Sequence, residues 1–158
     1  MEKIESFKVN HHNLLSGIYI SRTDRVADQV LITYDIRVTQ PNAQPVLNTA
    51  EIHTIEHLAA TFLRNHLSFK ERVIYFGPMG CRTGFYLILN GEDDYLVIRN
   101  LIIEMFEFIS NFEDEIPGAT AHDCGNYLDH NLTMAKYVST HFIEFLKSNQ
   151  GDNFAYSI

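Results

Sequence analysis

The stretch that decides the fold runs from Thr49 to Leu67 and reads TAEIHTIEHLAATFLRNHL. Its apolar residues recur at helical spacing, which predicts one amphipathic helix over this range. His53 and His57 lie four residues apart, so they share one face of the helix and can each offer an imidazole nitrogen to one metal ion. Glu56 stands where a carboxylate lies beside such an ion and can move protons. The pattern therefore indicates a metal site built on a helix.

The same residues also have a simpler interpretation. H-x-x-E-H is the spacing of inverted-type metallopeptidases, but a helix with two surface histidines and a surface glutamate would show it too. The metal site is favoured because both histidines border the apolar stripe and so face partly inward. Asn48, with Glu51 three residues later, forms a capping-box pattern that marks the start of the helix. The apolar stripe consists of Ile52, Ile55, Ala59, Phe62 and Leu63.

Length and composition are those of a globular protein. We expect residues 1–158 to form a single domain in which residues 148–158 are a frayed tail. The net charge of −8 and the pI near 5.4 argue against binding to nucleic acid or to anionic membranes, because both carry negative charge. No apolar run is long enough to span a bilayer, and the polar N-terminus lacks the apolar stretch of a signal peptide. These features predict a cytoplasmic protein.

Three segments are predicted to be strands. Residues 30–38 alternate between apolar and mixed side chains, so Asp35 and Arg37 share the less apolar face. Residues 72–76 and 84–90 are apolar on both faces. A sheet buried on both sides needs two covers, and on so small a chain helices supply only one. A second copy of the protein is therefore expected to supply the other.

The rest of the chain is less regular. Apolar residues at helical spacing predict two further helices, one over residues 94–110 and one over residues 132–147, the second capped by Asn131. Residues 1–29 show little periodicity and are predicted to be loop or short extended structure.

Two cysteines stand in loops that can carry chemistry. In a reducing compartment Cys81 and Cys124 are not expected to pair, which favours metal binding or catalysis. Cys81 lies beside Arg82, and a nearby cation lowers the pKa of a thiol, although a small residue packed in a turn explains this position more simply. Cys124 is the natural third metal ligand, because two imidazoles and a thiolate leave a fourth position open, as in catalytic zinc sites. His122 competes for that place, since spacing alone does not decide between them.

Five segments together form a distinctive set. They are His53-Thr54-Ile55-Glu56-His57-Leu58, Tyr34-Asp35-Ile36-Arg37, Gln40-Pro41-Asn42, residues 78–86 and Asp123-Cys124-Gly125. This set resembles the S-ribosylhomocysteine lyase family, also called LuxS, over nearly the whole chain. The resemblance implies an α+β fold in which a four-stranded antiparallel sheet carries helices on one face and meets a second subunit of a homodimer on the other. It also implies one divalent metal ion per subunit, with iron(II) as the native ion and zinc often found in isolated protein.

The resemblance further implies functional residues of three kinds. The implied metal ligands are His53, His57 and Cys124. The implied catalytic residues are Glu56 and Cys81, as a general acid/base pair, and Arg37, which favours the Cys81 thiolate. The implied substrate-binding residues are Ser6 and His11 of the partner subunit, together with Asp35 and Arg37. Positions that depart from the family pattern, namely Asp123, Asn10 and residues 16–19, remove none of the metal ligands or acid/base groups.

The family reaction cleaves the thioether of S-ribosylhomocysteine. It yields homocysteine and 4,5-dihydroxy-2,3-pentanedione, the precursor of autoinducer-2 in quorum sensing. Two proton shifts move the carbonyl along the ribose until the carbon–sulfur bond is β to it and can be eliminated.

Two other functions remain open at this point. A metal-dependent peptidase or deformylase-like amide hydrolase would use Glu56 to activate water on the metal, but it gives Cys81 and Arg37 no task. A metal-stabilised binding module without chemistry would have a closed site, with His122 as the fourth protein ligand.

Overall fold

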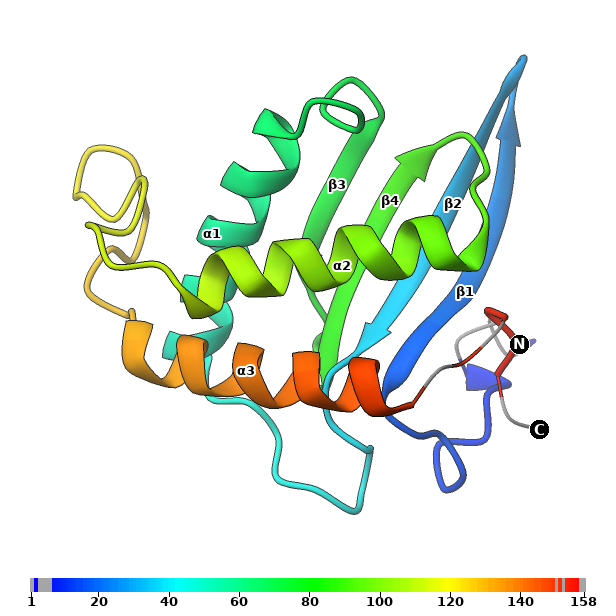
Figure 1. Ribbon diagram of the computed structural model, residues 1–158, viewed down its shortest axis with the longest axis horizontal. Helices are drawn as coiled ribbons and strands as arrows, with labels where there is room; N and C mark the ends of the chain where they lie inside the picture. Colours follow the sequence, from blue (N-terminus) through cyan, green and yellow to red (C-terminus); the bar gives the residue numbers. More distant parts are fainter. Residues whose placement is uncertain (1, 3–6, 150, 152, 157–158) are drawn as a thin grey trace.

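A computed structural model describes residues 2, 7–149, 151 and 153–156. Within these residues the chain forms four strands and three helices in an α+β arrangement (Figure 1). The strands are β1 (Gly17–Val26), β2 (Gln29–Arg37), β3 (Val73–Pro78) and β4 (Gly84–Asn90). The helices are α1 (Thr49–Asn65), α2 (Tyr95–Ser110) and α3 (Leu132–Ser148). None of the described helices is long and apolar enough to cross a membrane.

The four strands form one antiparallel sheet in the order β1-β2-β4-β3. Helices α2 and α3 cross in front of this sheet, and α1 lies beside β3 (Figure 1). The side chains on the helix-facing side of β2 and β4 are fully buried, as the alternation in β2 predicts. They are Ile32, Tyr34, Ile36, Phe85, Leu87 and Leu89.

The opposite face of the sheet is covered less completely. Half-buried side chains alternate with the core residues along β2 and β4, and they are mainly apolar or aromatic. They are Leu31, Thr33, Tyr86 and Ile88. A sheet face of this composition favours a further cover from outside the chain.

Helix α1 begins where the capping pattern predicts. The Asn48 N–H donates to the Glu51 carboxylate at 2.7 Å, which satisfies one of the free donors at the start of the helix. The inward face of α1 is fully buried at Ile55 and Leu58. The helix ends at Asn65, two residues before the predicted end, because the backbone turns extended at the next residue.

The long strand β1 is absent from the prediction for residues 1–29. It pairs with β2 along its whole length, from the Gly17–Arg37 pair to the Val26–Gln29 pair. Much of its second half is exposed at the edge of the sheet. Because solvent meets both faces there, the strand needs no alternation of apolar and polar residues, and its sequence shows little periodicity.

The prediction of a frayed C-terminal tail is wrong for residues 153–156. The Phe154 carbonyl accepts a hydrogen bond from the Ile20 N–H at 3.1 Å. The Phe154 ring packs on Tyr34 and Tyr95, with ring centroids 5.3 and 5.0 Å away. A single aromatic ring buries enough apolar surface to hold such a segment in place, although the sequence around it is polar.

Candidate metal centre

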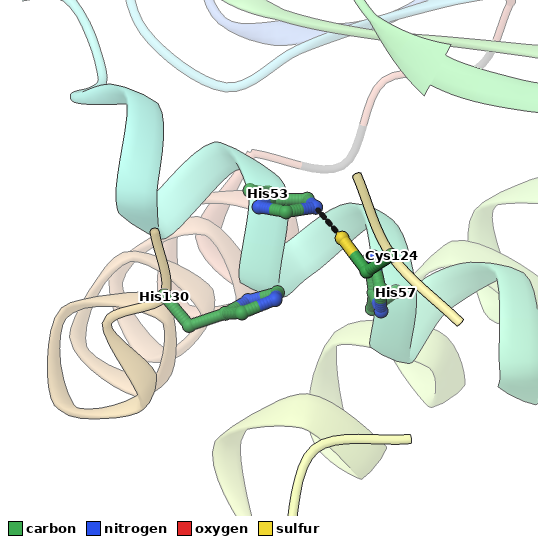
Figure 2. Close-up of side chains that lie close together, drawn as sticks. All are labelled: His53, His57, Cys124 and His130. Atoms are coloured by element: carbon green, nitrogen blue, oxygen red, sulfur yellow. Dashed lines mark hydrogen bonds between the residues drawn. The ribbon is translucent and has the colours of Figure 1, made fainter. Parts of the chain in front are cut away.

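Four side chains that can bind a metal ion lie together (Figure 2). Helix α1 supplies His53 and His57, whose ring centroids are 4.6 Å apart. The connection between α2 and α3 supplies Cys124 and His130. The ligand atoms of all four lie within 4.8 Å of one another, and all four side chains are half-buried. The helical spacing thus brings the two histidines to one face, and the long connection closes over them.

Backbone carbonyls hold both α1 histidines in one tautomer. Nδ1 of His53 lies 2.9 Å from the Asp129 carbonyl oxygen, and Nδ1 of His57 lies 2.8 Å from the Pro117 carbonyl oxygen. Because a carbonyl only accepts, each Nδ1 carries the hydrogen and each Nε2 keeps a lone pair. Nε2 of His53 is 3.3 Å from Sγ of Cys124. Histidine ligands are typically oriented in this way, so the residues fit an ion bound by two imidazoles and a thiolate.

The fourth member of the cluster differs from the residue that competed in the sequence. The His122 side chain is 95% exposed and pairs with Asp123 at 2.7 Å. His130 lies in the cluster instead, with its ring stacked on that of His53 at a centroid distance of 4.1 Å. Sequence reasoning missed His130 because it stands in a connection without periodicity. In the sequence, the only feature that points to His130 is its position between Cys124 and the start of α3.

Glu56 lies beside the cluster. Its carboxylate is 3.8 Å from Nε2 of His57, and a third of the side chain is exposed. The offset of three residues from His53 predicts a position of this kind. From it, a carboxylate can reach both solvent and a molecule bound at the cluster.

A second group of polar side chains surrounds Cys81. Arg37 donates from Nε and Nη2 to the Asp35 carboxylate, and both residues are almost fully buried. Nη1 of Arg37 donates to the Thr83 hydroxyl at 2.6 Å and lies 3.7 Å from Sγ of Cys81. Sγ of Cys81 is 3.1 Å from the same hydroxyl. The arginine thus reaches the thiol directly and through Thr83.

Gly84 makes this contact between two strands possible. A Cβ at Gly84 would lie 2.1 Å from the Ile36 carbonyl oxygen, so a larger residue would push β4 away from β2. The Thr83 carbonyl also accepts hydrogen bonds from the N–H groups of Val38 and Thr39, each at 3.0 Å. The loop that carries Cys81 is therefore fixed against the end of β2.

The surroundings of Cys81 hold the pKa of its thiol below the ordinary value. Burial by itself raises this pKa, but the hydrogen bonds with Thr83 and the positive charge of Arg37 outweigh it. Burial raises the pKa of Asp35, and the charge of Arg37 and a 3.0 Å hydrogen bond from Tyr156 oppose that rise. Tyr156 also stacks on Tyr19, so the C-terminal segment contributes to this group.

Two cavities lie next to these groups. One, of about 350 Å³, is lined by His11, Cys81 and Thr83 among others. The other, of about 330 Å³, lies between His53 and the loop from Met79 to Arg82. His11 and Cys81 thus line one cavity within a single chain, and the second cavity separates the metal-binding cluster from the Cys81 loop. Ser6 lies outside the described residues.

The fold and the two clusters define a class: a small α+β protein whose histidine and cysteine side chains can hold a metal ion, with an acid/base group beside it. The chain belongs to the S-ribosylhomocysteinase (LuxS) family, whose model matches residues 4–153. It is 58% identical over 156 residues to the S-ribosylhomocysteine lyase of Finegoldia magna and 56% identical over 156 residues to that of Clostridium acetobutylicum. Each alignment covers 99% of both chains. The resemblance inferred from the motifs is thereby confirmed.

Proposed function

We infer that this protein is an S-ribosylhomocysteine lyase. It cleaves the thioether of its substrate by carbonyl migration and β-elimination, and it releases homocysteine and 4,5-dihydroxy-2,3-pentanedione, the autoinducer-2 precursor. The observation that carries this conclusion is a His/Cys cluster that faces, across a cavity, the loop whose Cys81 thiol contacts Arg37 and Thr83, in a chain whose relatives are named S-ribosylhomocysteine lyase.

The metal-binding role falls to His53, His57 and Cys124, in the arrangement that their hydrogen bonds favour. A divalent ion, iron(II) in the cell and zinc in isolated protein by our proposal, supplies Lewis-acid stabilisation of negative charge on the oxygens of the sugar. The chain's own part is to hold the ligand atoms and to leave one side of the cluster accessible.

Proton transfer falls to Glu56 and Cys81. Each shift of the carbonyl removes a proton from one carbon of the ribose and returns it to a neighbouring oxygen or carbon. Two bases in different places suit this task, because different carbons must be deprotonated. Arg37 favours the thiolate form of Cys81, and Asp35 holds Arg37 in place. Arg37 and Asp35, together with His11 on the adjacent cavity, are our candidates for contacts with the substrate.

An amide hydrolase explains fewer of these contacts. It would use the cluster and Glu56, but it leaves the buried Asp35–Arg37 pair and the lowered pKa of Cys81 without a purpose. Buried ion pairs are costly to desolvate. Because the arginine of this ion pair contacts the Cys81 thiol, the pair favours a reaction that uses that thiol.

We also propose a single-domain, cytoplasmic homodimer with active sites at the interface. The half-buried face of the sheet, with Tyr86 and Ile88, supports this arrangement, as does Tyr75 of β3, which is 48% exposed. The acidic net charge is the reason to propose neither nucleic acid nor membrane as a partner.

Free thiol released from S-ribosylhomocysteine tests the proposed function. Metal-loaded protein should release one homocysteine thiol for each substrate consumed, as detected with a thiol-reactive dye. Methionine, a thioether that lacks the sugar, is the matched control and should give no thiol. A protein with full metal content that releases no thiol from S-ribosylhomocysteine would refute the proposal.

A further inference from the structure

The hydrogen bonds of Thr54 fix the tautomer of His130. The Thr54 hydroxyl donates its single hydrogen to the Ala50 carbonyl at 2.9 Å and accepts the Asn131 N–H at 2.9 Å. Nδ1 of His130 lies 3.1 Å from the same oxygen. Since the hydroxyl hydrogen is already used, Nδ1 of His130 must be the donor in this contact. Its other nitrogen, Nε2, is therefore left with a lone pair.

That lone pair is buried without a partner. Nε2 of His130 has no hydrogen-bond partner among the described residues, although it is closed off from solvent. Figure 2 shows the nitrogen-bearing edge of the His130 ring directed toward His53, His57 and Cys124. A buried acceptor left unpaired destabilises the fold. The position therefore favours a donor or an ion at the centre of the cluster.

The ring geometry excludes His130 and His53 as joint ligands of one ion in this arrangement. The two rings are stacked, with an interplanar angle of 20° and centroids 4.1 Å apart. The lone pair of an imidazole nitrogen lies in the ring plane, so stacked rings aim their lone pairs side by side and not at one point. The His57 ring is T-shaped to both, at 83° to His53 and at 79° to His130, so it can share an ion with either of them. His53 is also the ring in contact with Cys124, so it takes the ligand role.

We propose that Nε2 of His130 is a fixed hydrogen-bond acceptor for a hydroxyl of the substrate's sugar bound at the cluster of His53, His57 and Cys124. The inference rests on the proposed function for the identity of that hydroxyl. His130 thus contacts the substrate without binding the metal. Its fixed tautomer orients the hydroxyl, because Nε2 only accepts.

Cadmium-113 NMR of the wild-type protein tests the first half of this proposal. With uniform ¹⁵N labelling and ¹¹³Cd bound, the ring nitrogens of His53 and His57 should show scalar coupling to the metal, and those of His130 should show none. A coupling between ¹¹³Cd and Nε2 of His130 would overturn the proposal. This test needs no activity, so it stands even if the protein turns out not to cleave S-ribosylhomocysteine.

Kinetics of two variants test the second half. His130→Phe keeps a stacking ring and loses the acceptor, whereas His130→Gln restores an oxygen near the position of Nε2. We expect His130→Phe to bind one metal ion per chain and to raise KM about tenfold with little change in kcat, the mark of a lost substrate contact. His130→Gln should recover part of the loss. The exposed His122 provides the matched control, as His122→Gln should leave KM and kcat unchanged. An unchanged KM in His130→Phe, or a loss of metal in both variants, would overturn the proposal.

Discussion

At the scale of single residues, the chemistry of this protein depends on what surrounds each reactive group. Cys81 is an ordinary thiol until Thr83 and Arg37 lower its pKa. Backbone carbonyls take the Nδ1 hydrogens of His53 and His57, which leaves each Nε2 with a lone pair that can bind a metal ion. The sequence indicates the reactive residues through their spacing. It does not indicate the carbonyls that orient the two histidines, because Pro117 and Asp129 lie in a connection without periodicity.

Replacing Arg37 tests the electrostatic part of this account. The charge of Arg37 helps to hold the pKa of Cys81 below its ordinary value. In Arg37→Ala that pKa should rise, so the thiolate forms only at higher pH. The rate of iodoacetamide alkylation of Cys81, measured against pH in a Cys124→Ala background, should shift to higher pH. Arg82→Ala, a neighbour on the exposed side of the loop, is the control. An alkylation profile that does not move in Arg37→Ala would contradict the account.

Metal content separates ligands from acid/base groups. His57→Ala removes a proposed ligand. Because loss of even an indirect contact lowers metal affinity about 10–100-fold, we expect at least that loss. Glu56→Gln keeps the size of the side chain but accepts no proton, so it should keep its metal and lose about 10²–10⁴-fold in turnover. Metal analysis by mass spectrometry and steady-state rates measure both effects. Loss of metal in Glu56→Gln would show that Glu56 is a ligand.

At the scale of elements, the sequence predicts those helices and strands whose burial requires a recognisable pattern of apolar residues. Helix α1 and strand β2 lie within two residues of their predicted ends, because each has one buried face that sets a period of apolar residues. Strand β4 matches its predicted bounds for another reason, since it is a short run that is apolar on both faces. Strand β1 is not predicted, because its exposed half has no alternation of apolar and polar residues. The segment with Phe154 is not predicted for another reason. The Phe154 ring packs on Tyr34 and Tyr95, which are distant in the sequence, so the local sequence does not indicate this contact.

Phe154 should therefore contribute to stability. Its ring is partly buried against the core, so Phe154→Ala should lower the free energy of unfolding by about 2 kcal/mol, roughly half the cost of emptying a fully buried Phe site. Urea unfolding at a fixed protein concentration measures the change. Leu67→Ala, at a position that is 92% exposed, is the control and should have little effect. Equal stabilities for the two variants would mean that the C-terminal segment does not pack on the sheet.

At the scale of the whole molecule, two clusters and a half-covered sheet are joined in one small chain. The chain's own helices bury one face of the sheet, while the other face is only half-buried at Leu31, Thr33, Tyr86 and Ile88. The sequence predicts this need for a second cover from strands that are apolar on both faces, and the family resemblance adds the rest of the active-site plan. The spacing of residues within any one strand does not indicate which residues meet across a dimer interface.

Mixed dimers test whether the active sites are shared. His11→Ala and Glu56→Ala should each be nearly inactive alone. If His11 of one subunit completes a site that uses Glu56 of the other, co-refolding the two variants should restore about a quarter of wild-type activity, because half of the dimers then carry one intact site. The same variants mixed without refolding are the control. No recovery after subunit exchange, confirmed by mass spectrometry of the mixed dimer, would contradict shared sites.

Turnover of S-ribosylhomocysteine by Cys81→Ala tests the central claim most directly. This change removes the low-pKa thiol and leaves His53, His57 and Cys124 in place, so the variant should keep one metal ion per chain. Wild-type protein should release homocysteine and 4,5-dihydroxy-2,3-pentanedione in equal amounts. The variant, at matched metal content, should release both about 10²–10⁴-fold more slowly. A Cys81→Ala protein that forms both products at a near wild-type rate would contradict the account.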